Sequence, residues 1–162
     1  MKHTARRKAA SGFTLVELIV VIAIIGVLAA ILIPSLLGYV KKARHSSMNA
    51  SAKSLYNAAM AACRENEVTK PIPTDVYAYD GNGFGGVVNA SLNKYIYEYF
   101  PKAEDCHWAV KIDYDVPVGV MIAKDTTDTL IGTHPNPSNE DIDISAKTVT
   151  DILKFAETGS WS

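Results

Sequence analysis

Glu17 is the residue whose surroundings most clearly call for special chemistry. It lies near the start of the apolar stretch SGFTLVELIVVIAIIGVLAAILIPSLL, Ser11 to Leu37, and Leu18 to Val40 contains no Asp, Glu, Lys, Arg or His. A lone charge at the centre of a bilayer costs about 2.5–3.5 kcal/mol on insertion scales, and less near the interface. Buried charges persist when they are paired, so a carboxylate in this position needs an explanation.

A second group of side chains that could bind a ligand lies between His134 and Asp143. It gathers the oxygen donors that Ca²⁺ prefers on flexible loops. The spacing matches no EF-hand pattern, and acidic loops are usually solvated. We therefore expect no metal and no cofactor, and calcium binding is kept only as an alternative. The candidate residues are Asn136, Asn139, Glu140, Asp141 and Asp143.

The charge of the chain is unevenly distributed. The first eleven residues contain Lys2, Arg6, Arg7 and Lys8 and no acidic residue. The whole chain has 16 basic and 17 acidic residues, so without these four the balance is 12 basic to 17 acidic. This balance argues against direct nucleic-acid binding by the rest of the chain.

The element that carries Glu17 is predicted to be a membrane-length helix. About 20 apolar residues span a bilayer as a helix, and residues 13–40 supply that length. A cleaved secretory signal peptide fits less well, because the apolar region is too long and no A-x-A site follows it. The positive-inside rule favours a cytoplasmic N-terminus, but Lys41, Lys42 and Arg44 flank the other end and weaken that inference.

The residues around Glu17 also follow a specific order. A short basic leader ends in Gly12, then come Phe13 and Thr-Leu-Val-Glu, and then an aliphatic helix that contains Gly26 and Pro34. This stretch, GFTLVELIVVIAIIGVLAAILIP, resembles the N-terminal signature of type IV pilins and of the related type II secretion pseudopilins. The resemblance implies that a prepilin peptidase removes residues 1–12 by cleavage between Gly12 and Phe13 and then methylates the new N-terminus. Ser11 departs from the family pattern, in which Lys or Arg is common before the Gly.

The resemblance assigns roles to three further residues. Glu17 would pair with the N-terminal amine of a neighbouring subunit, and a carboxylate that reaches the lipid headgroups is the alternative. Pro34 lacks an N–H and clashes with the carbonyl of the preceding turn, while Gly26 lowers local helix stability. In the family the segment between Gly26 and Pro34 melts in the filament. The alternative is that membrane helices simply tolerate Gly and Pro.

The function implied by the resemblance is structural. The chain would be the prepilin of a type IV pilus and would polymerise with itself through its hydrophobic helix into an extracellular filament. Its other partners would be the prepilin peptidase, a membrane assembly platform with its ATPase, and the lipid bilayer before assembly. No catalytic motif accompanies the histidines and serines of the chain, so no enzyme activity is expected.

Location and two other functions follow from the same resemblance. Before assembly the protein would cross the cytoplasmic (inner) membrane once, with its leader in the cytoplasm and its head outside, and it would then move to a cell-surface pilus. A pseudopilin of a type II secretion or DNA-uptake system is the first alternative function. A pilin-framed surface adhesin that binds glycans is the second.

If the head lies outside the cytoplasm, its cysteines can be oxidised to a disulfide. Cys63 and Cys106 are the only two in the chain. An even number of cysteines in an oxidising compartment favours a disulfide. The sequence does not decide between a Cys63–Cys106 disulfide and two buried free thiols.

The predicted fold is α+β and pilin-like. The helical pattern continues from residues 13–40 through residues 41–69, where Pro71 ends it. Residues 70–162 form the globular head. Within it Lys70 to Gly86 is predicted as loop, and SLNKYIYEYFP as a short helix ended by Pro101.

Three strands and a final helix complete the predicted head. HWAVKIDYDVP alternates apolar and polar residues up to Val116, and strands at Val118–Lys124 and Thr129–Thr133 follow it to give a small antiparallel meander. A short C-terminal helix begins near Ser145, its predicted N-cap, and stops at Gly159.

Overall fold

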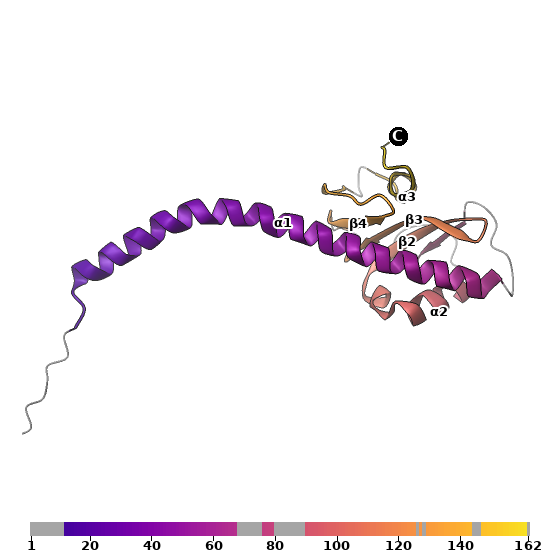
Figure 1. Cartoon of the computed structure of the whole chain (residues 1–162), viewed down its shortest axis with the longest axis horizontal. Coiled ribbons are helices and arrows are strands. Elements are labelled where there is room, and N and C mark those ends of the chain that lie inside the picture. Colours follow the sequence, from indigo (N-terminus) through magenta and orange to yellow (C-terminus); the bar gives the residue numbers. More distant parts are fainter. Residues whose placement is uncertain are drawn as a thin grey trace, which may run out of the picture. The chain divides into compact units, whose positions relative to one another are not determined.

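The computed structural model describes residues 12–67, 76–79, 90–125, 127, 129–143 and 147–161 (Figure 1). The chain divides into two compact units, Met1–Val40 and Lys41–Ser162. Helix α1 runs from Leu15 to Glu67, so its first part belongs to the N-terminal unit and its second part to the globular unit. The predicted leader up to Ser11 and most of the predicted loop between Lys70 and Gly86 lie outside the described residues.

The globular unit contains one antiparallel sheet. Its strands are β1 (Val76–Tyr79), β2 (His107–Asp113), β3 (Val116–Ala123) and β4 (Ile131–His134), hydrogen-bonded in the order β1-β2-β3-β4. The predicted meander is confirmed for the last three strands. The prediction of loop throughout Lys70–Gly86 is wrong at β1, because these four residues pair with Ala109–Ile112 of β2.

The first predicted strand is also too long. β2 stops at Asp113, and Tyr114 and Asp115 form a turn with positive φ angles before β3 begins at Val116. Tyr114 therefore does not continue the buried face of the strand, and its side chain is exposed. The sequence hides this turn because neither turn residue is Gly or Asn, the residues that such turns usually contain.

The short helices lie close to their predicted positions. α2 spans Ala90–Tyr99, and Pro101 opens a 3₁₀ helix, η1 (Pro101–Asp105), directly after it. α3 spans Val149–Thr158 and ends at Gly159, which has a φ of 76°. Its N-cap is Thr148, which forms a capping box with Asp151, so the prediction that the helix begins near Ser145 is wrong; Ser145 itself lies outside the described residues.

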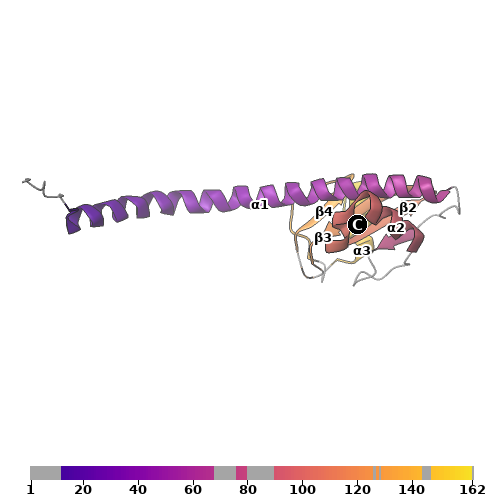
Figure 2. The same cartoon turned by 90° about the horizontal axis from the view of Figure 1, so that it is seen from below.

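The sheet of the globular unit is covered on both faces (Figure 2). On one face the second part of α1 and α2 form a core cluster with the sheet around Trp108, Leu55 and Ile96, all fully buried. On the other face α3 packs Ile152 and Leu153 against Met121 and Ile131. Small residues at positions 52, 59 and 62 of α1, all Ala, allow the helix to approach the sheet closely.

The edge strand β4 lies directly against the backbone of α1. A Cβ placed on Gly132 would overlap the carbonyl group of Met48 and would lie 2.9 Å from the backbone nitrogen of Asn49. The Asn49 side chain holds this contact on both sides: its Oδ1 accepts a hydrogen bond from Thr133 N–H at 3.0 Å, and its Nδ2 donates to the Ser138 carbonyl at 2.7 Å. A side-chain amide of the helix therefore satisfies the outer edge of the sheet at this point.

Candidate functional site

The described part of the chain begins at the predicted cleavage site. Gly12, Phe13 and Thr14 precede the first residue of α1, Leu15. The Phe13 side chain is 86% exposed, and a Cβ on Gly12 would meet no atom within 4 Å. The Gly12–Phe13 bond thus lies before the helix and is sterically open to a peptidase.

Glu17 forms a capping box with Thr14 at the start of α1. Its Oε2 accepts hydrogen bonds from the Thr14 backbone N–H and the Thr14 hydroxyl, both at 2.8 Å. The Thr14 hydroxyl in turn accepts one from the Glu17 N–H at 3.3 Å. These contacts satisfy backbone donors that the first turn of a helix leaves without intrahelical partners. The carboxylate is therefore held where the helix macrodipole favours negative charge.

Sequence reasoning missed Thr14, although a signal for it was present. Thr-x-x-Glu directly before an apolar run is the spacing of a capping box. Both hydrogen bonds that the Glu17 carboxylate accepts from the described residues involve Oε2. Oε1 is left for a donor from another molecule, so the cap and an intermolecular ion pair are compatible.

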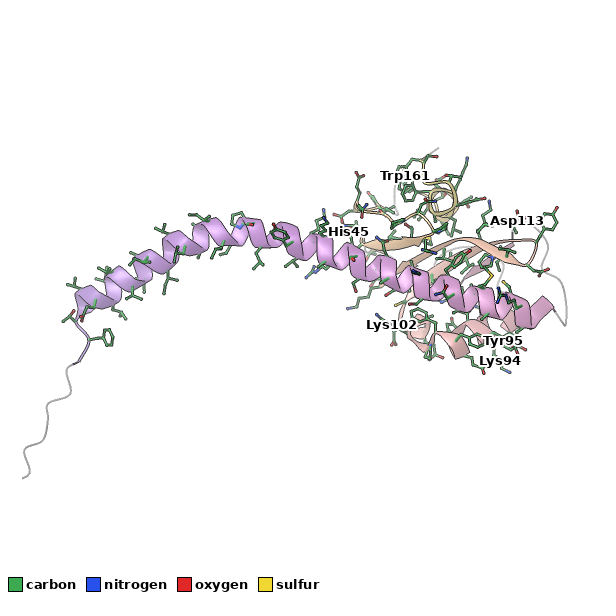
Figure 3. The ribbon with its side chains drawn as sticks, in the orientation of Figure 1. His45, Lys94, Tyr95, Lys102, Asp113 and Trp161 are labelled. Carbon is green, nitrogen blue, oxygen red and sulfur yellow. The ribbon has the colours of Figure 1, made fainter. Side chains whose placement is uncertain are left out.

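The side chains that follow Glu17 form a continuous exposed apolar surface (Figure 3). α1 is the one helix in the described part of the chain that is long and apolar enough to cross a membrane, with a mean hydropathy of 3.2 in its most apolar window, none of it buried. An apolar surface of this size indicates contact with lipid or with another protein. It includes Leu18, Ile22, Ile25, Ile31, Leu32 and Leu36.

α1 continues through Gly26 and Pro34 without a break. A Cβ on Gly26 would meet no atom within 4 Å, so no contact within the described residues requires a glycine there. The predicted melting of this segment concerns the packed filament, and it stays a prediction.

Comparisons with known proteins agree on the N-terminal region. Residues 7–33 match the family model described as the prokaryotic N-terminal methylation motif. The chain is 34% identical over 106 residues to the type IV major pilin protein PilA of Myxococcus xanthus. It is also 56% identical over 41 residues to the type IV wide pilus major component PilA4 of Thermus thermophilus. The N-terminal region of the chain thus matches the methylation motif and is similar to type IV major pilins.

The two alignments cover different shares of the proteins. They include 65% and 25% of this chain, and 44% and 31% of the two relatives, so the matched part spans less than half of either relative's length. No solved structure matches the chain. The long apolar helix of this chain fits a membrane-anchored precursor.

The two cysteines of the chain lie at the same core cluster. Cys63 is fully buried on α1, and Cys106, which follows η1, packs against the cluster with part of its surface exposed. Both are free thiols in the structure, but Cys106 is only half-buried. Burial and then the negative charge of Asp115 raise the pKa of Cys63 to about 12, and burial raises the pKa of Cys106. A disulfide in an oxidising compartment stays a prediction.

Alkylation of the folded protein near pH 8 is expected to label Cys106 before Cys63. The thiolate is the reactive form, and Cys63 combines complete burial with the pKa of about 12. Mass spectrometry after timed iodoacetamide treatment measures the order, and labelling in denaturant provides the reference in which both react. A requirement for prior reduction at both positions would show instead that the disulfide forms.

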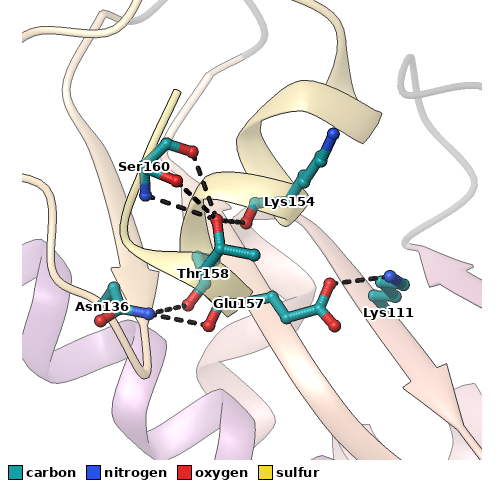
Figure 4. A network of polar contacts seen from close by, with 7 residues as sticks. Lys111, Asn136, Lys154, Glu157, Thr158 and Ser160 are labelled. Atoms are coloured by element: carbon teal, nitrogen blue, oxygen red, sulfur yellow. Dashed lines mark hydrogen bonds and ion pairs between the residues drawn. The ribbon is translucent and has the colours of Figure 1, made fainter. Parts of the chain in front are cut away.

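The loop that carried the calcium candidates serves as a connection between elements (Figure 4). The Asn136 side chain donates hydrogen bonds to the carbonyls of Ala156 and Glu157, both at 2.9 Å, and so caps the C-terminal end of α3. Ser138 is buried, and its N–H donates to the Thr133 hydroxyl at 2.8 Å. Across the described residues no group of three or more His, Cys, Asp or Glu side chains is placed to hold a metal ion. Asn139, Glu140 and Asp143 are exposed.

Asp141, another of these candidates, joins the same loop to α1. Its Oδ2 lies 2.7 Å from Lys41 Nζ, and its Oδ1 lies 3.1 Å from Nε2 of His45, a buried side chain. The hydrogen bond from Lys41 is the largest of the effects that hold the pKa of Asp141 below its usual range. The carboxylate is therefore used in an ion pair and is a poor calcium ligand.

The Asp141→Asn variant is expected to be slightly less stable than the wild type at neutral pH, and this difference should vanish in acid. A carboxyl whose pKa is lowered on folding stabilises the folded state above its unfolded pKa of about 3.9, and this contribution is lost as the pH falls through the folded pKa. Because the Asp141 side chain is 43% exposed, we expect a difference of no more than about 1 kcal/mol at pH 7. Thermal unfolding of the full chain in detergent at pH 7 and pH 3 measures it, and a difference that persists at pH 3 contradicts the ion-pair explanation.

Proposed function

We propose that this chain is a prepilin whose mature form polymerises into an extracellular type IV pilus. Prepilin peptidase cuts between Gly12 and Phe13 and methylates the new amine. The observation that carries the proposal is the combination at the start of α1. It consists of an open Gly12–Phe13 bond, a capped Glu17 and, after them, a membrane-length apolar stretch whose side chains are all exposed or half-exposed. Both relatives are named as major pilus components, which favours a pilus subunit over a pseudopilin.

The same apolar surface serves two environments in succession. In the bilayer the exposed side chains face lipid, and the capping box gives the Glu17 carboxylate two hydrogen bonds that reduce the penalty for placing it there. In the filament these side chains face those of other copies. Cleavage creates an α-amine at Phe13. The protonated amine of a neighbouring subunit donates a hydrogen bond to Oε1 of Glu17. The ion pair sets the register between copies.

The proposed topology follows from charge and family membership. The basic leader, with Lys2, Arg6, Arg7 and Lys8, stays in the cytoplasm, and the globular unit lies outside. A membrane assembly platform and its ATPase extract the cleaved subunits. In the filament the segment between Gly26 and Pro34 unwinds, because Pro34 removes one helical hydrogen bond and Gly26 disfavours helix. An unbroken helix there in a filament reconstruction would contradict this last step.

The experiment that tests the proposal is substitution of Gly12 in a host that processes prepilins. Gly12→Val is expected to block leader removal, so that the precursor accumulates in the membrane and no filaments form, because a β-branched residue restricts the backbone that must enter the peptidase. Mass spectrometry of the N-terminal peptide gives the result. Ser11→Ala serves as the matched control and should be processed normally. Cleavage of the Gly12→Val chain at the wild-type rate, or an unprocessed wild-type chain, would overturn the proposal.

A further inference from the structure

The turn that joins β2 to β3 contains a conformation that its residues do not favour. Tyr114 and Asp115 have φ angles of 47° and 62°, both in the left-handed region. Hairpin turns with two such residues usually contain Asn-Gly or Asp-Gly, because a glycine or asparagine adopts this conformation at low cost. An aromatic residue at the first position is strained. Since the turn would form more easily with Asn at position 114, the Tyr side chain is not there to favour the fold.

The Tyr114 side chain points into solvent. It is 76% exposed, and the side chain of Val116 beside it is 45% exposed. Asp113 and Asp115 flank the ring on both sides in the sequence. Aromatic residues are enriched at protein interfaces, where they supply contact area at a low cost in conformational entropy. We call residues 113–116 the hairpin tip, and it combines an exposed apolar group with two carboxylates.

The hairpin tip lies at one end of the globular unit. The charge of Asp115 acts on Cys63, close to the C-terminal end of α1, and Figure 3 shows Asp113 at the end of the unit opposite to His45. The segment just before His45 carries the opposite charge: Lys42 and Arg44 are both exposed, whereas Lys41 is paired with Asp141. Along a helix with a rise of 1.5 Å per residue, Lys42 and Cys63 are about 32 Å apart.

We propose that the hairpin tip of one copy docks against Lys42 and Arg44 of the next copy along the filament. The guanidinium and ammonium groups match the two carboxylates in charge, and either cation binds well against the face of an aromatic ring. Because the two surfaces are different and lie at opposite ends of one unit, the contact is head-to-tail, and repeated head-to-tail contacts build an open helical polymer. The proposal rests on the proposed function as a filament subunit and adds to it a specific contact between globular units.

Charge reversal in the full chain tests this contact. Asp113→Lys alone and Lys42→Glu with Arg44→Glu are each expected to lower the filament yield at least about fivefold, as loss of roughly 1 kcal/mol per contact would. All three substitutions together should restore the yield. Glu104→Lys, which reverses an exposed acid on η1, is the matched control and should have no effect. Unchanged yield in the single reversals, or no rescue in the triple variant, would overturn the contact while wild-type filaments keep the proposed function intact.

Tyr114→Asn separates a contact role from a structural role. The variant is expected to melt at the same temperature as the wild type or higher, because Asn relieves the strain of the turn. Its filament yield is nevertheless expected to fall. A lower melting temperature, or a wild-type yield, would show that Tyr114 acts within the fold or has no role in assembly, and either result would overturn the proposal.

Discussion

The Glu17→Ala variant is expected to enter the membrane and lose its leader as the wild type does, yet to form no filaments. Removing the carboxylate makes insertion no harder, since a charge in an apolar segment opposes insertion. It leaves the new amine of a neighbouring subunit buried without a partner. Breaking one side of a buried ion pair costs about 3–5 kcal/mol, which is about a hundredfold or more in each subunit contact. Membrane fractionation, mass spectrometry of the N-terminus and electron microscopy of sheared filaments give the three measurements.

Two further variants distinguish the charge of Glu17 from its role as a helix cap. Glu17→Gln keeps an oxygen that can accept from Thr14 but removes the charge, and it is expected to lose filaments as well. Thr14→Val removes the hydroxyl that bonds to Glu17 but keeps the carboxylate, and it should assemble with a cost of about 1 kcal/mol at the helix start. Filaments from Glu17→Gln together with none from Thr14→Val would show that the cap, rather than the ion pair, is what assembly needs.

The largest effect on the stability of the globular unit is expected from Gly132→Ala. The added methyl group would overlap the carbonyl of Met48 on α1, and backbone atoms cannot move aside as a flexible side chain can. β4 would have to separate from the helix, which also lengthens the hydrogen bond between Thr133 and Asn49. We expect a loss of about 3 kcal/mol or more in the free energy of unfolding, the upper part of the range for overpacked cores. Thermal unfolding of the full chain in detergent, followed by near-ultraviolet circular dichroism, measures it.

Two other glycines provide a graded control for this prediction. At Gly119 an added Cβ would lie 2.8 Å from the Leu153 carbonyl, so Gly119→Ala should destabilise the unit less than Gly132→Ala does. At Gly38 it would meet no atom within 4 Å, and Gly38→Ala should not lower stability, since Ala is the better helix former. A different order of the three variants would mean that close backbone approach does not govern these positions.

The parts of the fold that the sequence predicted are those set by local pattern. The apolar run and the Ala-rich stretch after it extend over so many turns that α1 could be recognised without a structure. β1 could not, because Val76–Tyr79 is a short segment between Pro- and Gly-rich sequences and becomes a strand only by pairing with β2. The sequence also predicts too late an end for β2. Tyr114 has a high strand propensity, but in the structure it forms the turn of the hairpin.

In the candidate site, too, the residues set by a local motif could be predicted and the long-range contacts could not. Gly12, Phe13 and Glu17 can be proposed as site residues from the sequence because a short contiguous motif carries them. Thr14, the partner of Glu17 within the chain, belongs to a local capping pattern that our sequence analysis did not use. The oxygen donors near Asn136 resembled a ligand set only while their partners were unknown. Their actual contacts, with the end of α3 and with Lys41, join residues far apart in the sequence. Composition alone does not show where such side chains point.

The side-chain amide of Asn49 affects how copies of this protein can associate through the edge of the sheet. An edge strand normally exposes N–H and C=O groups that recruit a strand from another molecule, the first step toward amyloid-like aggregation. On β4 the Thr133 N–H is already bonded to Asn49, and the backbone of Met48 lies against Gly132. At Gly132 and Thr133 an incoming strand would find the Thr133 N–H already bonded and the backbone of α1 in its way. This part of β4 is therefore poorly suited to recruiting a strand from another copy, which favours association through the exposed apolar surface of α1 over cross-strand aggregation.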